Sequence, residues 1–339
     1  MKRKILIISS KEDPHTKLVK WGLKKMKADV THWAWDEFPM NSSCCFEMGN
    51  DPLMDTFTLE TQKIQKKNLF DVIWVRRFAT PSVKKGTHEL DIEFVLNESK
   101  TFLATLLPHV ASDDCIWINH PNSSELAKNK IRQLMIARKL GFRIPHTFIG
   151  NSFSGLTEFN EKLRNDLILK SFEQKQWVVP NDSVVYTRTS KVEKSKLRES
   201  FPVEACPNIY QEYIEKQFEV RVTVIGNAVF ASKINANTTD WRFDANHGNG
   251  CLSMIELPDE VAQKSLAICR EFGLNFAAID FAVEPSGQYV FFELNHAGQF
   301  LWIDSYCSES NLLREFCGFL AGVNSSGFQF NLREFADEL

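Results

Sequence analysis

Short apolar runs alternate with amphipathic stretches along the first third of the chain. Residues 4–10 form an apolar run that ends in serines, which predicts a buried strand, and the apolar spacing over 18–26 predicts a helix packed on it. The same patterns predict, in order, a strand at 30–35, a strand at 71–77, a helix at 89–107 and a strand at 115–119. Strands that alternate with helices favour a mainly parallel α/β layer, whose binding sites lie at the carboxyl ends of the strands.

The pattern changes after a loop-like segment at 119–124, which marks a domain boundary. Helical periodicity from Glu125 to Leu140 is followed by Gly141, where a helix C-cap is expected. Strands then follow at 148–149, 167–170, 177–179, 184–187, 209–213, 219–225 and 228–235, with helices at 156–165, 259–272 and 312–320. Together the two halves predict the α/β (α+β) class.

Polar side chains gather on two apolar strands in the last region. Asp280 closes the apolar run 276–279, and Glu293 and Asn295 lie two residues apart in the strand 289–295, so they project to one face. A turn between the two runs predicts that they pair as antiparallel neighbours, which brings Asp280 next to the other two. Hard oxygen ligands of this kind suit Mg²⁺. The alternative is that they are polar strand ends that face water.

Composition sets limits without naming a function. The 339 residues allow about two or three domains. A net charge of −3 and a pI near 6.3 argue against nucleic acid as the main partner. The 8 cysteines contain no C-x-x-C spacing, no apolar run is long enough to span a membrane, and the run after the basic first residues is too short for a signal peptide. These features predict a cytoplasmic protein without a membrane segment.

Nucleotide phosphates would need an unusual source of positive charge here. The chain has neither a P-loop pattern nor a G-x-G-x-x-G that follows a strand. Two lysines are placed to supply the charge: Lys130 near the start of a helix, and Lys170 at the end of an apolar strand, where a charge needs a partner. The alternative is that both are solvated surface residues.

Taken in order, these pieces resemble the ATP-grasp superfamily over most of the chain. Asn129 and Lys130, which open a helix that ends at 137–145, are similar to the region of the first nucleotide lysine of that family, and Lys170 with its strand is similar to that of the second. The resemblance further implies a hinge at Gln211, Glu212, Tyr213 and Ile214 that reads adenine through backbone groups, a ribose-binding Glu219, and magnesium ligands Asp280, Glu293 and Asn295. The implied organisation is a parallel α/β pre-ATP-grasp domain at 1–118, a small central subdomain at 119–205, a C-terminal antiparallel-sheet subdomain with the magnesium site at 206–325, and a tail at 326–339.

Within the superfamily, the resemblance is closest to the microviridin-type (graspetide) peptide maturases. It is carried by the stretches 74–77, 219–224, 240–242 and 293–302. It implies ATP and Mg²⁺, with two ions, as cofactors and a precursor peptide with a leader as partner, with homodimers frequent among such enzymes. The chain departs from the family pattern in His296, where Pro is frequent, and in the loop 171–176, which lacks the glycines that cover phosphates in many members.

The implied chemistry joins side-chain carboxylates to Ser/Thr hydroxyls or Lys amines through an acyl phosphate, with release of ADP and phosphate. Arg221 and Arg242 are the candidates for stabilising charge that develops on the γ-phosphate and the tetrahedral intermediate. For Arg221 the alternative is a structural same-face pair with Glu219, and for Arg242 a surface cation–π pair with Trp241.

Other residues keep two interpretations each. His120, His247 and His296 are candidate bases, although loop histidines are more often exposed or hydrogen-bonded. Arg76 and Arg77 either bind a substrate carboxylate or stabilise a domain interface, and the second is favoured. The stretch 300–302 is expected in the core or in a wall. Alternative functions are a ligase for free amino acids or small metabolites and a catalytically silent nucleotide-binding module.

Overall fold

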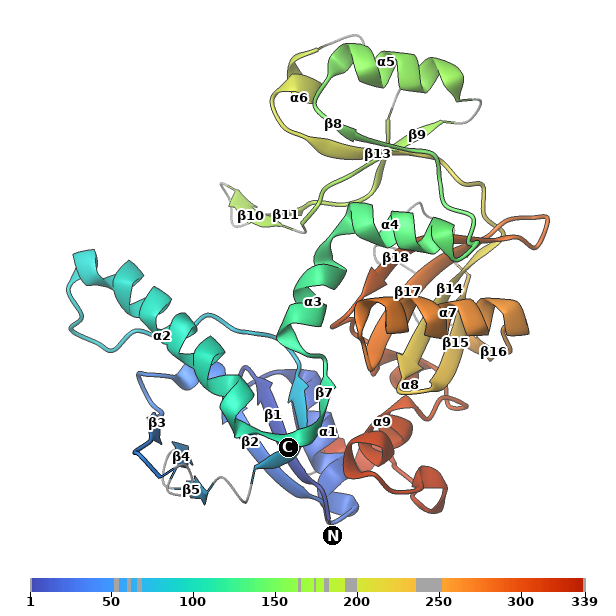
Figure 1. The fold of residues 1–339 in the computed structure, drawn as a ribbon. Helices are drawn as coiled ribbons and strands as arrows, with labels where there is room; N and C mark the ends of the chain where they lie inside the picture. Colours follow the sequence, from blue (N-terminus) through green and yellow to red (C-terminus); the bar gives the residue numbers. More distant parts are fainter. Residues whose placement is uncertain are drawn as a thin grey trace.

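The computed structural model describes residues 2–51, 55–59, 62–65, 69–163, 166–173, 175–179, 183–192, 200–235 and 252–337. Figure 1 shows a parallel sheet near the N-terminus, a small sheet under α5 and a third sheet beside α7, with α3 and α4 running between them. The mixed α/β class predicted for the chain is therefore confirmed. No helix in the described ranges is both long and apolar enough to cross a membrane.

The first sheet is parallel, with the order β2-β1-β6-β7. Its apolar runs are continuous because both faces are covered. Ile5 and Ile7 pack on the side of α1 and α9, whereas Leu6 and Ile8 pack on the side of α2. The elements are β1 (Lys4–Ser9), α1 (Pro14–Lys25), β2 (Asp29–Ala34), β6 (Phe70–Val75), α2 (Ile92–Leu106), β7 (Ala111–Ile118) and α9 (Leu312–Ala321).

The second sheet is antiparallel, with the order β12-β9-β13-β8, and carries α5 on a small core around Leu156 and Tyr210. A separate hairpin, β10 with β11, follows β9 along the chain; its connection at 180–182 lies outside the described residues. The elements are β8 (Thr147–Gly150), α5 (Phe153–Lys162), β9 (Leu167–Lys170), β10 (Gln176–Val179), β11 (Ser183–Tyr186), β12 (Ser190–Val192), α6 (Phe201–Glu204) and β13 (Asn208–Glu212).

The third sheet is antiparallel, with the order β16-β15-β14-β17-β18. Phe142, Phe281 and Phe291 pack together in the core between this sheet and its helices. The elements are α3 (Pro121–Lys128), α4 (Lys130–Lys139), β14 (Phe218–Ile225), β15 (Ala228–Ile234), β16 (Leu252–Ile255), α7 (Asp259–Phe272), β17 (Phe276–Val283), β18 (Tyr289–Asn295) and α8 (Trp302–Tyr306).

The helix predicted from Glu125 to Leu140 is wrong as a single element. It consists of α3 and α4, which Asn129 separates with φ −71° and ψ 100°. Asn129 Oδ1 accepts the backbone N–H of Arg132 at 2.9 Å, so Asn129 is an N-cap that opens a new helix. The break places Lys130 at the first residue of α4, which confirms the helix start that the resemblance implied at Asn129 and Lys130.

Several short elements carry no clear pattern in the sequence and were not predicted. They include a small antiparallel sheet beside the first sheet, with the order β3-β4-β5. The unpredicted elements also include β12, β16, α6, α8 and short 3₁₀ turns. The bounds not yet given are β3 (Cys44–Glu47), β4 (Thr56–Leu59), β5 (Gln62–Gln65) and α10 (Leu332–Asp337), with 3₁₀ helices at Trp35–Glu37, Glu89–Asp91, Leu107–Val110 and Ser325–Gly327.

Candidate active site

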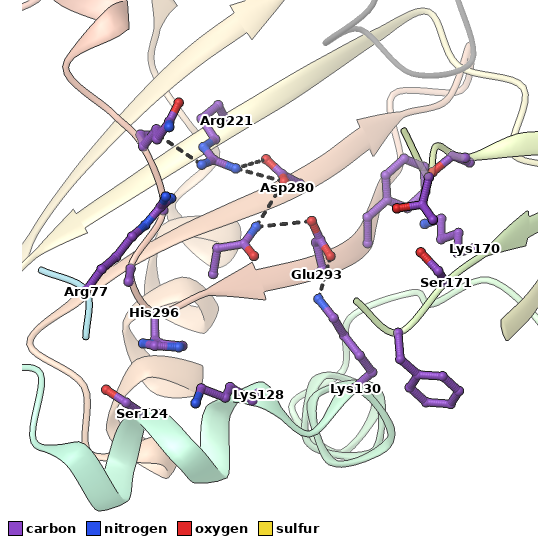
Figure 2. Close-up of a pocket in the computed structure, with 18 of the residues that line it drawn as sticks. Arg77, Ser124, Lys128, Lys130, Lys170, Ser171, Arg221, Asp280, Glu293 and His296 are labelled. Atoms are coloured by element: carbon purple, nitrogen blue, oxygen red, sulfur yellow. Dashed lines mark hydrogen bonds and ion pairs between the residues drawn. The ribbon is translucent and has the colours of Figure 1, made fainter. Parts of the chain in front are cut away.

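A cleft of about 1210 Å³ opens between the three sheets. Its walls come from the end of β6, from α3 and the start of α4, from β9, and from β14, β17 and β18. Figure 2 shows side chains from these elements pointing toward one another across the cleft. Residues that are far apart in sequence are therefore brought to a single site.

One row of charged side chains crosses the third sheet. In the strand register Arg221 lies opposite Asp280, and Asp280 lies opposite Glu293. Arg221 Nη1 donates to both Asp280 oxygens, at 2.7 and 2.8 Å. Asn295 Nδ2 donates to Glu293 Oε1 at 3.1 Å and to Asp280 Oδ2 at 3.5 Å. The predicted strand pairing is confirmed, and Asp280, Glu293 and Asn295, hereafter the triad, lie together as expected (Figure 2).

A β-bulge shapes the wall beside the triad. Asp280 pairs with Glu293 but Phe281 pairs with Phe291, so Phe292 is an extra residue in β18. Strict alternation would send Phe292 to the core side. The bulge instead lets the consecutive residues Phe292 and Glu293 both line the cleft, while Phe291 packs in the core. The bulge thus adds an aromatic ring to the wall next to a charged group.

Both lysines predicted for the nucleotide line this cleft. Lys130 Nζ lies 2.6 Å from Glu293 Oε2, and Lys170 Nζ lies 4.7 Å from the centre of the Phe292 ring. Burial alone would raise the pKa of Glu293, but the charges of Lys130 and Lys170 hold it below its usual range. Burial lowers the pKa of Lys170, an effect that Glu293 opposes and Lys130 reinforces. Lys170 therefore has the charged and aromatic neighbours that its place on an apolar strand requires.

The predicted adenine hinge divides between the cleft and the interior. Tyr213 and Ile214 line the cleft. The side chains of Gln211 and Glu212 instead are buried away from it: Gln211 Nε2 donates to Thr147 Oγ1 at 3.1 Å, and Glu212 Oε2 accepts the backbone N–H of His146 at 3.3 Å. Any contact of Gln211 and Glu212 with a nucleotide would thus have to come from their backbone.

Glu219 and Arg221 lie on one face of β14, as their spacing predicts, and both line the cleft. Glu219 is buried and forms an ion pair with Lys216, another cleft residue. The same-face geometry is therefore confirmed, whereas the ribose-binding role of Glu219 stays a prediction. Arg242, together with Asp240, Trp241 and His247, lies outside the described residues.

The cleft also contains residues that the sequence analysis did not single out. Ser124, Lys128 and Tyr306 line it, together with Arg77 and Trp302. Figure 2 shows Arg77, Ser124 and Lys128 on the side of the triad away from Lys170. Ser124 and Lys128 lie on α3, and their only sequence signal is that they share a helix face close to Lys130.

His120, His296 and Arg76 lie in different surroundings. His120 Nδ1 accepts the backbone N–H of Asn122 at 3.2 Å and caps α3, which agrees with the hydrogen-bonded alternative for this residue. His296 lines the cleft, and burial together with the charge of Lys128 lowers its pKa to about 4. Arg76 is buried and donates to the carbonyl of Ala297, which agrees with the interface role favoured for it. Of the stretch 300–302, Phe300 and Leu301 are in the core and Trp302 is in the cleft wall.

The fold matches that of a solved ATP-grasp enzyme over nearly the whole chain. The solved enzyme is a RiPP-associated ATP-grasp ligase from Chryseobacterium gregarium, in complex with ADP and a leader and core peptide. It is 27% identical to the present chain, with a TM-score of 0.85, and the match covers 94% of this chain and 97% of that one. The chain belongs to the ATP-grasp superfamily.

Other ATP-grasp structures share this fold at lower identity. A macrocyclase from Microcystis aeruginosa, bound with a precursor peptide, is 23% identical with a TM-score of 0.81, and the match covers 94% of this chain and 99% of that one. The ATP-grasp ligase PsnB, complexed with a precursor variant, Mg and ADP, is 20% identical with a TM-score of 0.75 and coverage of 94% and 98%. The predicted ATP-grasp fold is thus confirmed.

Curated proteins match the present chain more weakly. Beta-citrylglutamate synthase B from Danio rerio is 24% identical over 209 residues, which is 60% of this chain and 50% of that protein. A probable alpha-L-glutamate ligase from Mannheimia succiniciproducens is 24% identical over 220 residues, 64% of this chain and 66% of that protein. The chain spans about half the length of the first curated relatives that it matches. No family model matches it.

Proposed function

We propose that the chain is an ATP-dependent ligase that acts on a ribosomally made peptide. A side-chain carboxylate of the peptide takes the γ-phosphoryl group of ATP, which gives an acyl phosphate and ADP. A Ser/Thr hydroxyl or Lys amine then attacks the acyl carbon, loses its proton and expels phosphate, leaving an ester or amide crosslink. The observation that carries the proposal is the convergence of the triad with Lys130, Lys170 and Arg221 in one cleft.

The end of the cleft next to β9 fits a nucleotide. Ile168, Ile214 and Phe292 provide an apolar wall for a base, and Glu219 is an acceptor for ribose hydroxyls. Lys170 and the start of α4 lie between this wall and the triad, where the α- and β-phosphates would be neutralised. The bound ADP in the Chryseobacterium gregarium ligase supports this assignment.

The triad has the donors that Mg²⁺ prefers, namely carboxylate and amide oxygens. No group of three His, Cys, Asp or Glu residues suited to a metal occurs in the part of the chain that the structure describes. Two carboxylates and one amide leave room for phosphate oxygens, which suits ions held jointly by protein and nucleotide. When bound, Mg²⁺ would offset the negative charge of the β- and γ-phosphates. The Mg and ADP in PsnB support the assignment, and two ions stay a prediction.

Arg221 is the described residue best placed to bind the transferring phosphoryl group. It lines the cleft beside the triad, and Asp280 holds its Nη1. A guanidinium that is already held on one side can bind an anion without first being ordered. Arg242 stays a candidate for the same role.

The other end of the cleft fits a peptide. At about 1210 Å³ the cleft exceeds the roughly 300–1,000 Å³ typical of small-molecule pockets, so a nucleotide does not fill it. Arg77 and Lys128 supply positive charge for acidic side chains, and Trp302 and Tyr306 supply aromatic surface. The peptides bound in the Chryseobacterium gregarium and Microcystis aeruginosa structures support a peptide substrate.

A mass-shift assay tests the proposed function. With ATP and Mg²⁺, we expect the cognate precursor peptide to lose one water mass per crosslink while equal amounts of ADP form. The Glu293→Gln variant is expected to stay folded and to lose at least about 10²-fold in rate, because a magnesium ligand is replaced by a neutral group. Crosslinking by this variant at the normal rate would contradict the assignment of the triad.

A second function is favoured by the curated relatives, which are glutamate ligases or related synthases. In that case the same cleft would activate the carboxylate of a free metabolite or peptide terminus and join it to an amino acid. The assay separates the two, because addition of an amino acid raises the product mass, whereas crosslinking lowers it. A mass gain would replace the peptide crosslinking proposal with this alternative.

A further inference from the structure

Side chains from the N-terminal part of the chain bind the backbone of residues 296–301, the loop that follows β18. Asn119 Nδ2 donates to His296 O at 2.8 Å, and Arg76 Nη1 donates to Ala297 O. Both Asn119 and Arg76 are only 2% exposed. The loop beside the triad is therefore held from the first sheet and not only by its own strand.

His15 binds the other end of this loop. Its Nε2 accepts the backbone N–H groups of Phe300 and Leu301, at 3.2 and 3.4 Å. His15 is buried, and its ring lies 5.5 Å from that of Phe300. Donors or acceptors from the N-terminal part thus engage both ends of residues 296–301.

Arg76 is the charged member of these contacts, and it is itself held in place. Its backbone N–H donates to Ile8 O at 2.9 Å, which continues the pairing of β1 with β6. Its Nε lies 3.8 Å from Asp13 Oδ2, and Asp13 is fixed because it caps α1. Loss of the bond to the Ala297 carbonyl would leave a buried guanidinium donor unsatisfied, which costs free energy.

The middle of the loop contacts Arg221 directly. Arg221 Nη2 donates to Gln299 O at 3.0 Å. A Cβ at Gly298 would lie 2.8 Å from Arg221 Nη2 and 2.6 Å from the Cβ of Ala278, so only glycine fits there. The position of Arg221 between Asp280 and the loop therefore depends on where the backbone of 297–299 lies.

We propose that Arg76 is a positioning residue for the active site, acting through the backbone of residues 297–299 on Arg221 and the triad. The inference rests on the proposed function. Arg76 lines the cleft, but among the described residues it contacts neither the triad nor Arg221; its effect passes through Ala297 and Gln299. The first sheet thereby sets the geometry of a site built on the third sheet.

Calorimetry of ADP binding to the full chain at several Mg²⁺ concentrations tests this role without requiring turnover. We expect Arg76→Gln to raise the Mg²⁺ concentration needed for half-maximal ADP affinity by about tenfold, as is typical when a residue that orients a metal site is changed. We also expect kcat to fall about tenfold with a smaller change in KM for ATP. Arg76→Lys, which keeps a buried cation and donor, is expected to recover part of both.

Arg3→Ala is the matched control. Arg3 Nη1 also donates to a backbone carbonyl of the C-terminal part, Phe319 O at 2.9 Å, but it lies away from the cleft. We expect this variant to lower the melting temperature and to keep the wild-type Mg²⁺ requirement and kcat. If Arg76→Gln behaves like Arg3→Ala, Arg76 is only structural and the inference is overturned.

Gly298→Ala tests the same path from within the loop and covers the case in which Arg76→Gln does not fold. It is expected to raise the Mg²⁺ requirement, and its effect and that of Arg76→Lys should not be additive, because both act on Arg221. A wild-type Mg²⁺ requirement in Gly298→Ala, or full additivity, overturns the inference. If the unaltered chain binds no Mg²⁺-ADP, the proposed function itself fails. If the unaltered chain binds Mg²⁺-ADP but the variants keep its Mg²⁺ requirement, only the inference about Arg76 fails.

Discussion

At the scale of single residues, each carboxylate of the triad lies against a cation. Asp280 is bound by Arg221, and Glu293 by Lys130, so each negative charge lies against a positive one. Asn295 lies between the carboxylates and donates to both with a neutral amide. A third carboxylate in its place would have no cation in these contacts. The choice of an amide therefore limits repulsion at the site.

Asn295→Asp tests this balance. The change removes the two donated hydrogen bonds and adds a negative charge, so we expect a loss of about 1–3 kcal/mol of unfolding free energy without Mg²⁺. Added Mg²⁺ should restore most of it, because the ion binds the extra carboxylate. Thermal unfolding in EDTA and in excess Mg²⁺ measures both, with Asn97→Asp, exposed on α2, as control. Equal stability loss with and without Mg²⁺ would show that the triad does not bind the ion.

At the scale of elements, the break between α3 and α4 decides where Lys130 lies. Asn129 ends one helix and caps the next, so Lys130 starts α4 and reaches Glu293. A continuous helix would rotate and shift this residue relative to the cleft. The local capping preference of one asparagine thus contributes to the geometry of the site.

We expect Asn129→Ala to cost about 1 kcal/mol of unfolding free energy, because α4 loses its N-cap. We also expect it to weaken ADP binding severalfold, because the first turn of α4, which holds Lys130, is no longer fixed. The control is Ser152→Ala, which removes the N-cap of α5, where Ser152 Oγ accepts the N–H of Gly155 at 3.1 Å. Urea unfolding should show a similar loss in both variants, and calorimetry a loss of ADP affinity only in the first. Unchanged ADP affinity in Asn129→Ala would show that the cap does not position Lys130 for nucleotide binding.

Elements with strong local signals were predictable from sequence. Helix α7 matches the range 259–272 because its acidic first turn and the left-handed Gly273 at its end mark both limits. Strands β17 and β18 were predictable from their apolar and aromatic runs, and their pairing from the turn between them. This local information sufficed to bring the triad together.

The features that were missed depend on contacts between distant segments. The bulge at Phe292 is set by the pairing of β18 with β17, and the alternation of residues along β18 alone does not predict it. The inward burial of Gln211 and Glu212 depends on Thr147 and His146 of a neighbouring segment. Such contacts are made only after the sheets assemble, so spacing along the chain does not reveal them.

At the scale of the whole molecule, the first sheet and α9 share one core. Ile5, Trp74, Phe316 and Leu320 are buried in the same cluster, and α9 packs against α1. His15 on α1 joins this core to the loop at 296–301. Stability of the N-terminal part is therefore tied to the loop beside the active site.

His15 makes that link sensitive to pH. Burial, together with the charge of Arg76, lowers the pKa of His15 from 6.5 to about 3, whereas Asp13 opposes the shift. The neutral ring is the form that accepts the two N–H groups. Because the unfolded chain binds this proton at higher pH than the folded one, the contribution of His15 to stability is present above pH 6.5 and is lost as the pH falls toward 3.

In His15→Gln the amide oxygen can still accept an N–H group, but the residue does not titrate. We therefore expect the unfolding free energy of the wild type to fall by up to about 1.4 kcal/mol more per pH unit than that of the variant between pH 6 and 4, a window that lies within about 3 to 6.5. Urea unfolding at several pH values measures the difference.

His32, whose pKa is lowered to about 4, contributes a similar slope to both proteins, so its effect cancels in the difference. His88→Gln, at an exposed position, is the control and should keep the wild-type slope. Parallel curves for wild type and His15→Gln would mean that the ring is not held neutral against the loop.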